Sequence, residues 1–368
     1  MRIIIAAGGT GGHVYPAMAI AEALKQRYPD VSLYFVGSVG GFERPLLAES
    51  TVEFDTHDEI YAGPIHGVGL LRTVISAFQL MFGTLQALLL VMRRKPQALL
   101  LTGGWVGLPV ALAAWLLRVP ELIFLPDIEP GLTIRVLRRF ARRVALTVED
   151  SKAYFVGNDT VVTGYPLRAE MMSATREAGI QHFGLDAERK TLLVFGGSRG
   201  SRAINNALLE IVPELLADGL QVIHVTGTLD WAEIEARRHA MSDISRYQAF
   251  PYLHREMGLA MAAADLVVCR SGASVLGEFP YFGLPSILIP LAYAWRYQTV
   301  NADYLASRGA ALRMDEDVMK QSLLSTIRQL MNDAPRLQTM RAAALALARP
   351  DGAARAAEQL AELAGGGA

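Results

Sequence analysis

The chain has 368 residues, enough for two domains of ordinary size that each bury their own core. Hydrophobic residues make up 52% and charged residues 19%, a composition that argues against a disordered chain. The single cysteine, Cys269, excludes a disulfide framework and a cysteine-based zinc site, and it is compatible with a reducing compartment.

Short β-branched runs alternate with helical stretches along most of the chain. Continuous apolar strands separated by helices are typical of parallel sheets covered on both faces. We therefore predict an α/β protein of two doubly wound, Rossmann-like domains that face each other across a cleft. The expected strands are 3–6, 33–36, 98–102, 122–125, 144–147 and 161–163 in the first half, and 191–195, 221–225, 266–268 and 286–289 in the second.

A glycine-rich turn at residues 8–12 (Gly-Gly-Thr-Gly-Gly) follows the first strand and leads into a helix. Backbone N–H groups of such a turn can approach a phosphate at the positive end of the helix. The spacing does not fit GxGxxG, and the second strand lacks the acid that holds the ribose of NAD, so an oxidoreductase is disfavoured. A turn that only packs tightly is the alternative.

His13 follows this turn directly and is expected to point into the cleft. A neutral imidazole there can take a proton from an attacking hydroxyl group, which makes His13 the candidate general base. A histidine that only caps or packs locally is the alternative. The other six histidines show no HxH or HExxH pairing, so no histidine-based metal site is expected.

The segment Thr73–Met92 contains twenty residues without a charge, flanked by Arg72 and by Arg93-Arg94-Lys95. Its length fits a membrane-spanning helix, but Ser76, Gln79, Thr84 and Gln86 interrupt it. A buried core helix is a second interpretation, and a partly exposed helix lying in the membrane interface is the favoured one. Ten Lys or Arg residues against three acids between Ile65 and Ala145 can attract anionic lipid or nucleic acid.

The turn at residues 163–166 and the polar stretch behind it divide the chain. We expect one domain at 1–164, a second domain at 165–345, and a C-terminal helix at 346–368. The Ala-rich C-terminal helix is expected from about Arg341, with a kink at Pro350.

A second glycine turn at residues 196–201 repeats the spacing of the first one. A third block, residues 269–278, follows the strand 266–268, and its small residues suit a helix N-terminus that receives a diphosphate. Glu278 lies one turn beyond Ser274, where a carboxylate can accept both hydroxyls of a ribose. A surface glutamate is the alternative. Gln298 and Asn301 follow at a helix start where amides can contact sugar hydroxyls.

Asp315-Glu316-Asp317 matches the DxD that binds a metal in some glycosyltransferases. No glycine loop precedes it, so a solvated helix start is the favoured interpretation.

Together these residues resemble the MurG family of UDP-N-acetylglucosamine transferases, over nearly the whole chain. The matching stretches are GGTGGHVYPAMAIAEAL at the start, GGWVGLPVALAAW at 103–115, PGLTIR at 130–135, GGSRGSRAIN at 196–205 and CRSGASVLGEFPYFGLPSILIP at 269–290. The GGTGGH and 269–290 blocks are specific, whereas the Ala- and Leu-rich stretches are not.

The resemblance implies a GT-B fold and inversion at the anomeric carbon, with no required metal or other cofactor. It implies transfer from UDP-GlcNAc to a lipid I-like acceptor in peptidoglycan synthesis, at the cytoplasmic face of the membrane. The enzyme would be peripheral there, bound to an anionic membrane surface and not to nucleic acid. The resemblance assigns residues 1–164 to the acceptor and the membrane and residues 165–345 to the UDP-sugar, with the C-terminal helix returning to the first domain. The substrate-binding residues that it implies are Thr10, Gly11 and Gly12 for the acceptor diphosphate and donor sugar, and Arg168, Ser198, Ala273, Ser274, Glu278 and Gln298 for the donor, with the backbone of His254 meeting the uracil. For the leaving UDP we expect stabilisation by Arg270 or Arg199.

The chain departs from the family pattern at four places, the first of which is residues 124–127, where the family has a His-Glu-Gln-Asn run. Asp127 replaces an asparagine that contacts the donor sugar, and the run before it reads Phe124-Leu125-Pro126. Tyr165, Arg199 and Tyr297 also stand where the family has other residues. A related transferase with another lipid acceptor or another donor sugar therefore stays open, as does a catalytically silent scaffold that binds the sugar nucleotide.

Overall fold

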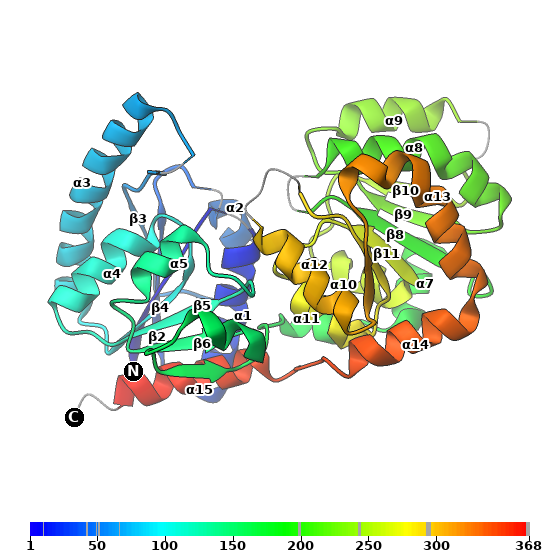
Figure 1. Cartoon of the computed structure of the whole chain (residues 1–368). Helices are drawn as coiled ribbons and strands as arrows, with labels where there is room; N and C mark the ends of the chain where they lie inside the picture. Colours follow the sequence, from blue (N-terminus) through cyan, green and yellow to red (C-terminus); the bar gives the residue numbers. More distant parts are fainter. Residues whose placement is uncertain are drawn as a thin grey trace. The chain divides into compact units, whose positions relative to one another are not determined.

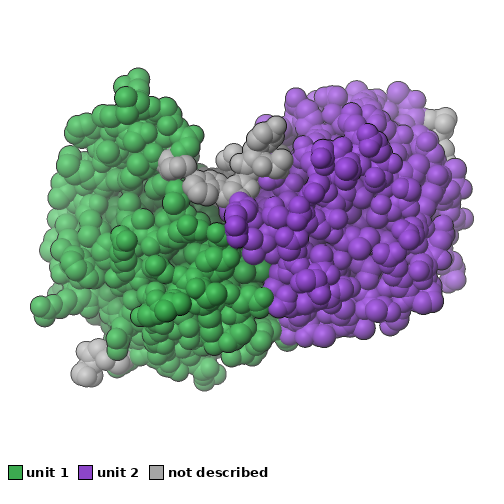
Figure 2. Space-filling view, viewed as in Figure 1, with its two compact units in different colours: residues 1–168, 349–368 green, residues 169–348 purple. Residues whose placement is uncertain are grey.

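A computed structural model of the chain describes residues 1–9, 11–41, 43–48, 50, 52–65, 67–197, 200–241, 244–291 and 296–365. The chain divides into two compact units, shown in different colours in Figure 2. Unit 1 contains residues 1–168 and 349–368, and unit 2 contains residues 169–348. The two boundaries between the units lie a few residues after the expected domain boundaries, and the C-terminal residues belong to unit 1.

Unit 1 alternates strands and helices, as Figure 1 shows. Its elements are β1 (Arg2–Ala7), α1 (Gly11–Arg27), β2 (Ser32–Ser38), α2 (Glu43–Ala48), β3 (Thr56–Ile60), α3 (Leu70–Arg94), β4 (Ala98–Gly103), α4 (Gly107–Leu116), β5 (Glu121–Leu125), α5 (Leu132–Leu137), β6 (Arg143–Leu146), the 3₁₀ helix η1 (Glu149–Tyr154), β7 (Thr160–Val162) and, from the end of the chain, α15 (Gly352–Gly365).

Unit 2 repeats this alternation. Its elements are α6 (Ala169–Met172), α7 (Arg176–Phe183), β8 (Thr191–Phe195), α8 (Arg202–Ala217), β9 (Gln221–Val225), α9 (Trp231–His239), β10 (Tyr247–Phe250), α10 (Glu256–Ala263), β11 (Leu266–Cys269), α11 (Val275–Phe282), β12 (Ser286–Leu288), α12 (Tyr297–Ser307), β13 (Ala311–Arg313), α13 (Glu316–Asn332) and α14 (Ala334–Leu345).

Both sheets are parallel and have the same winding. Their strand orders are β3-β2-β1-β4-β5-β6-β7 and β10-β9-β8-β11-β12-β13, so each sheet starts at a central strand and reverses direction once. The central strands β1, β4, β5, β8 and β9 are almost entirely buried because helices cover both faces. The prediction of two doubly wound α/β domains is confirmed.

Three strands were not expected from the sequence: β3, β10 and β13. All three lie at a sheet edge, where one side of the strand has no partner and an apolar run is not required. Their sequences, THDEI, YQAF and ALR, are short or polar, so they lack the apolar signal of the central strands.

The expected kinked helix at the C-terminus is instead two helices, α14 and α15, separated by residues 346–351. Pro350 lies in this connection, in agreement with its inability to continue a helix. The turn after it packs tightly on unit 1, because a Cβ at Gly352 would lie 2.7 Å from the carbonyl oxygen of Tyr165. Helix α15 then packs on α1, β4 and β5.

The apolar segment 73–92 lies within α3, a 25-residue helix that packs beside α4 (Figure 1). Only Ser76, Leu80, Gly83, Ala87 and Val91, spaced three or four residues apart, are buried. The interpretation as a buried core helix is therefore wrong. By length and composition α3 could cross a membrane, although such a helix alone is weak evidence of a span.

Candidate active site

Each sheet has its strand-order reversal at the position where the sequence places its glycine loop. In unit 1 the reversal lies between β1 and β4, which lead into residues 8–12 and Gly103-Gly104. In unit 2 it lies between β8 and β11, which lead into residues 196–201 and 270–274. Ligands of doubly wound sheets bind at the carboxyl ends of the strands beside this reversal. The fold therefore provides one candidate ligand site in each unit.

His13 lies in the first turn of α1, beside the end of β4. Its Nδ1 is 3.0 Å from the carbonyl oxygen of Gly8. A carbonyl only accepts hydrogen bonds, so Nδ1 carries the proton and Nε2 is the basic nitrogen. Among the described residues, Nδ1 is the only ring nitrogen of His13 with a hydrogen-bond partner. The ring is thus oriented as a general base requires.

The end of β4 holds His13 in place from the other side. The hydroxyl of Thr102 donates to the carbonyl oxygen of His13 at 2.7 Å. Gly103 has φ +131°, and a Cβ there would lie 2.6 Å from Cδ2 of the imidazole, so only glycine leaves room for the ring. Burial by these neighbours lowers the pKa of His13 below its usual 6.5, so the ring is neutral at physiological pH.

The other predicted residues of unit 1 lie near the same sheet edge. Gly11 and Gly12 form the N-terminus of α1, and the guanidinium of Arg168 lies 4.3 Å from the centre of the Tyr15 ring on that helix. Asp127 follows β5, in a turn held by Thr147, whose hydroxyl lies 2.9 Å from the carbonyl oxygens of Leu125 and Pro126. Thr10 lies outside the described residues.

In unit 2, the third sequence block forms the start of α11. Ser274 precedes this helix, Ala273 is buried, and the N–H of Glu278 donates to the carbonyl oxygen of Ser274 at 2.9 Å. Glu278 therefore lies one turn into α11, as its spacing indicated. Gln298 begins α12, and its amide oxygen accepts the N–H of Leu291 at 2.9 Å.

Two further positions complete the predicted set in unit 2. The N–H of His254 donates to Glu256 at 3.1 Å, so in this structure that backbone group is bound within the loop. Ser198 and the neighbouring Arg199 lie outside the described residues.

Arg270 has a different environment from the one that the sequence suggested. Its side chain is only 9% exposed and donates to the hydroxyl of Ser201 at 2.9 Å, while its ion pair with Glu316 measures 2.5 Å. It also reaches the carbonyl oxygens of Ile289 and Pro290, at 3.3 Å each. The guanidinium thus connects the loops after β8, β11 and β12 with the start of α13.

The interpretation of 315–317 as a purely solvated helix start is correspondingly incomplete, since Glu316 pairs with the buried Arg270. In the described part of the chain, no group of three His, Cys, Asp or Glu residues is arranged to hold a metal ion.

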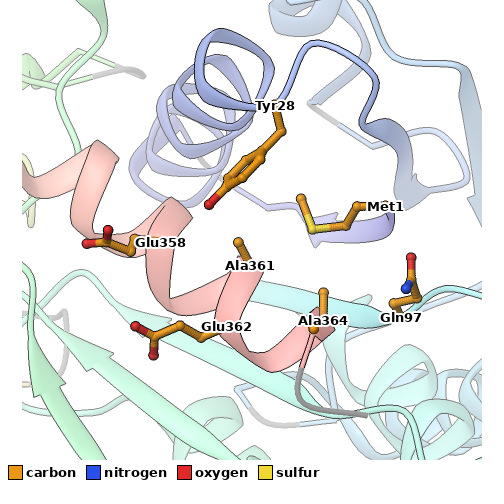
Figure 3. A pocket seen from close by; sticks show the side chains of 8 residues that line it. Met1, Tyr28, Gln97, Glu358, Ala361, Glu362 and Ala364 are labelled. Carbon is orange, nitrogen blue, oxygen red and sulfur yellow. The ribbon is translucent and has the colours of Figure 1, made fainter. Parts of the chain in front are cut away.

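A cavity of about 500 Å³ lies at the opposite edge of the unit 1 sheet, where β1 and β4 begin (Figure 3). Tyr28, Glu358 and Glu362 contribute to its lining. The two carboxylates already pair with Arg27, at 3.2 Å, and with Arg143, at 2.8 Å. The cavity is therefore separate from the glycine loops, and both of its carboxylates are already paired with arginines.

The sequence analysis missed Thr102 and Thr147. Each follows an apolar strand run and bonds to a backbone carbonyl of a neighbouring element. A threonine at the end of a buried apolar strand is the signal that could have indicated them, because its hydroxyl can donate to a backbone carbonyl of a neighbouring element.

Two family descriptions cover most of the chain. The N-terminal domain of glycosyltransferase family 28 matches residues 3–146, and the C-terminal domain of that family matches residues 191–360. With the two reversal points, these matches define a two-domain glycosyltransferase.

Comparison with named proteins shows which kind of glycosyltransferase the chain is similar to. A Desulforudis audaxviator protein named UDP-N-acetylglucosamine–N-acetylmuramyl-(pentapeptide) pyrophosphoryl-undecaprenol N-acetylglucosamine transferase is 39% identical over 95% of both chains. A protein of the same name from Chlorobaculum tepidum is 38% identical over 98% of both. The crystal structure of Acinetobacter baumannii MurG has a TM-score of 0.74 and 26% identity, covering 98% of this chain and 99% of that one. The chain belongs to this family of N-acetylglucosamine transferases.

Proposed function

We infer that the protein transfers N-acetylglucosamine from UDP-GlcNAc to the lipid-linked muramyl-pentapeptide precursor, the step from lipid I to lipid II in peptidoglycan synthesis. Membership of the family supports this reaction. The single observation that carries the mechanism is the geometry of His13, whose protonated Nδ1 is bound to Gly8 and whose Nε2 is basic.

The chemistry follows from the two candidate ligand sites. His13 Nε2 takes the proton of the acceptor hydroxyl as that oxygen attacks the anomeric carbon of the donor sugar. The bond from this carbon to the β-phosphate oxygen of UDP breaks, and the configuration inverts. The diphosphate leaves with its negative charge stabilised by backbone N–H groups at the starts of α8 and α11 in unit 2. Glu278 orients the nucleotide through its ribose.

Turnover of purified protein tests the reaction. UDP-GlcNAc and a synthetic lipid I analogue should together release UDP and form the disaccharide product. UDP-glucose and UDP-GalNAc as donors, and diacylglycerol and other polyprenyl-diphosphate-linked sugars as acceptors, test the related transferases. UDP binding without turnover on any acceptor would leave a binding scaffold as the function.

The surface of α3 supports action at a membrane. Its outward face carries large exposed apolar side chains, with Leu70, Phe78, Leu85 and Leu89 each more than half exposed. Arg72, Arg93 and Lys95 are exposed at its two ends. An apolar face with basic ends fits a helix that lies in the interface of an anionic bilayer. We place the enzyme at the cytoplasmic face of the membrane, bound peripherally, where this helix meets the lipid part of its acceptor.

A further inference from the structure

A chain of buried polar side chains crosses unit 2 beside its glycine loop. The Tyr247 hydroxyl lies 2.8 Å from Nδ1 of His224, and Nε2 of His224 lies 3.0 Å from Oδ1 of Asn205. The Asn205 amide nitrogen donates to Asp230 at 3.0 Å, and Asp230 pairs with Arg202 at 2.9 Å. None of these residues is part of the mechanism given above.

The direction of every bond in this network is determined. Asn205 uses its amide nitrogen to donate to Asp230 and to the carbonyl oxygen of Thr226, at 2.9 Å, so its Oδ1 must be the acceptor for His224. His224 therefore carries its proton on Nε2, and its Nδ1 accepts from the Tyr247 hydroxyl. Burial lowers the pKa of His224 to about 3, so the ring stays neutral and the arrangement does not change with physiological pH.

The network meets the glycine loop at a backbone contact. Gly200 has φ +76°, and a Cβ there would lie 2.3 Å from the carbonyl oxygen of Thr226, the same oxygen that Asn205 holds. Asn205 also donates its own N–H to the carbonyl oxygen of Ser201 at 2.8 Å. Asn205 is thus bonded to the end of the glycine loop on one side and to the turn after β9 on the other.

We propose that the Tyr247–His224–Asn205–Asp230 network is a positioning device for the diphosphate of the sugar nucleotide. It fixes the turn after β9 and the start of α8, and so holds the backbone of Gly200 and Ser201, where the glycine loop leads into α8, in the geometry that the diphosphate requires. The proposal rests on the proposed function only in naming a sugar nucleotide as the ligand. Buried polar networks hold a single geometry because each unsatisfied group is costly, whereas apolar packing tolerates small shifts.

The variant Asn205→Asp tests this role because it keeps the shape of the side chain. It removes the amide donor and places a carboxylate against Asp230 and the carbonyl oxygen of Thr226. We expect the dissociation constant for UDP by calorimetry, and the KM for UDP-GlcNAc, to rise between about 10-fold and 100-fold. The KM for the lipid acceptor should change less than about twofold.

Gln221→Glu is the matched control, because Gln221 lies at the start of β9, the strand that carries His224 near its other end. Gln221 is a buried amide that donates to the carbonyl oxygen of Asp186 at 2.8 Å and to Thr191 at 3.1 Å. Its replacement should lower the Tm but leave UDP affinity as in the wild type. Equal UDP affinity in Asn205→Asp and the wild type, with a lowered Tm, would show a merely structural network and overturn the proposal.

Tyr247→Phe removes a single hydroxyl at the far end of the network and serves if Asn205→Asp does not fold. We expect a smaller rise of the UDP dissociation constant, about threefold to tenfold, again without a change in acceptor KM. Unchanged UDP affinity in a folded Tyr247→Phe protein would count against the proposal. Because UDP binding is measured without turnover, failure of the transfer reaction in the wild type would be seen separately.

Discussion

His13 in unit 1 and His224 in unit 2 show how one fold supports two different uses of an imidazole. Each lies near the carboxyl edge of its sheet, and burial lowers the pKa of each. Both nitrogens of His224 are hydrogen-bonded, whereas among the described residues only Nδ1 of His13 has a partner. A fully bonded ring holds structure, and a half-bonded neutral ring can accept a proton. The partners of a histidine, more than its burial, decide its role.

The same contrast extends to the two units as wholes. In unit 1 the basic nitrogen of His13 lies beside the glycine loop. In unit 2 the buried polar groups beside the loop, including Arg270, are bound to protein partners. We infer that unit 1 determines the rate of the reaction and unit 2 determines how the donor is held.

Removal of the base gives the largest expected effect. His13→Ala should lower kcat by at least about 100-fold, with little change in Tm or UDP affinity, because only proton transfer is lost. Steady-state kinetics with saturating donor measures this. His239→Ala is the control, since His239 makes the same type of bond, Nδ1 to the carbonyl oxygen of Glu235 at 2.8 Å, on an exposed helix. A near-wild-type rate in His13→Ala would transfer the role of base to Asp127 or another group.

The second prediction addresses donor binding in unit 2. Glu278→Ala should weaken UDP binding by about 1.5–3 kcal/mol, because two hydrogen bonds from the ribose to a charged acceptor are lost. Calorimetry with UDP measures this. Removal of the 2′-hydroxyl from the ligand should reduce the affinity of the wild type more than the affinity of the Glu278→Ala variant. Wild-type affinity in Glu278→Ala would remove this residue from ribose binding.

The third prediction concerns the surface of unit 1. Arg93→Gln with Lys95→Gln should weaken binding to anionic vesicles by about fivefold for each charge removed, and UDP affinity should not change. Arg94 is left intact because it pairs with Asp58 at 3.2 Å.

The matched control removes two exposed charges from unit 2, Arg308 and Lys320. Flotation with neutral and anionic vesicles at two salt concentrations distinguishes the surfaces, since screening by salt weakens only the charged contribution. If the two double variants lose vesicle binding to the same extent, α3 is not the docking surface. Association resistant to carbonate would instead indicate a spanning helix.

The last prediction concerns stability instead of activity: its pH dependence should have opposite signs in the two units. Burial raises the pKa of Glu121 in unit 1 to about 8. The stability that comes from keeping this carboxyl protonated in the folded state is therefore fully present below pH 4.5, and it is lost as the pH rises towards 8. The lowered pKa of His224 in unit 2 has the reverse result: stability is lost as the pH falls from 6.5 towards 3. Each loss amounts to about 1.4 kcal/mol per pH unit.

Thermal unfolding between pH 4 and pH 9 measures both trends. Glu121→Gln should raise the Tm above pH 7, by roughly 2–4 °C for each kcal/mol recovered, and leave the acid side unchanged. An unaltered alkaline slope in this variant would show that Glu121 is not buried as a neutral acid.

The sequence by itself determined the central strands, the two glycine loops and the position of Glu278. Each of these depends on local properties: continuous apolar runs mark buried parallel strands, and glycine marks the turns between strand and helix. Strands β8 and β9 were predicted with the bounds that the structure gives. The family resemblance rested on the same local motifs, and it is confirmed.

Tertiary structure alone decided the rest. The edge strands β3, β10 and β13 are strands because a neighbour pairs with them, and their own residues carry little apolar signal. Arg270 was expected to contact substrate, yet Ser201 and Glu316, 69 and 46 residues away in the chain, surround its guanidinium. The roles of His13 and His224 likewise depend on which distant groups meet their nitrogens. Hydrogen bonds are short and directional, so the partners of a polar side chain are known only once the chain has folded.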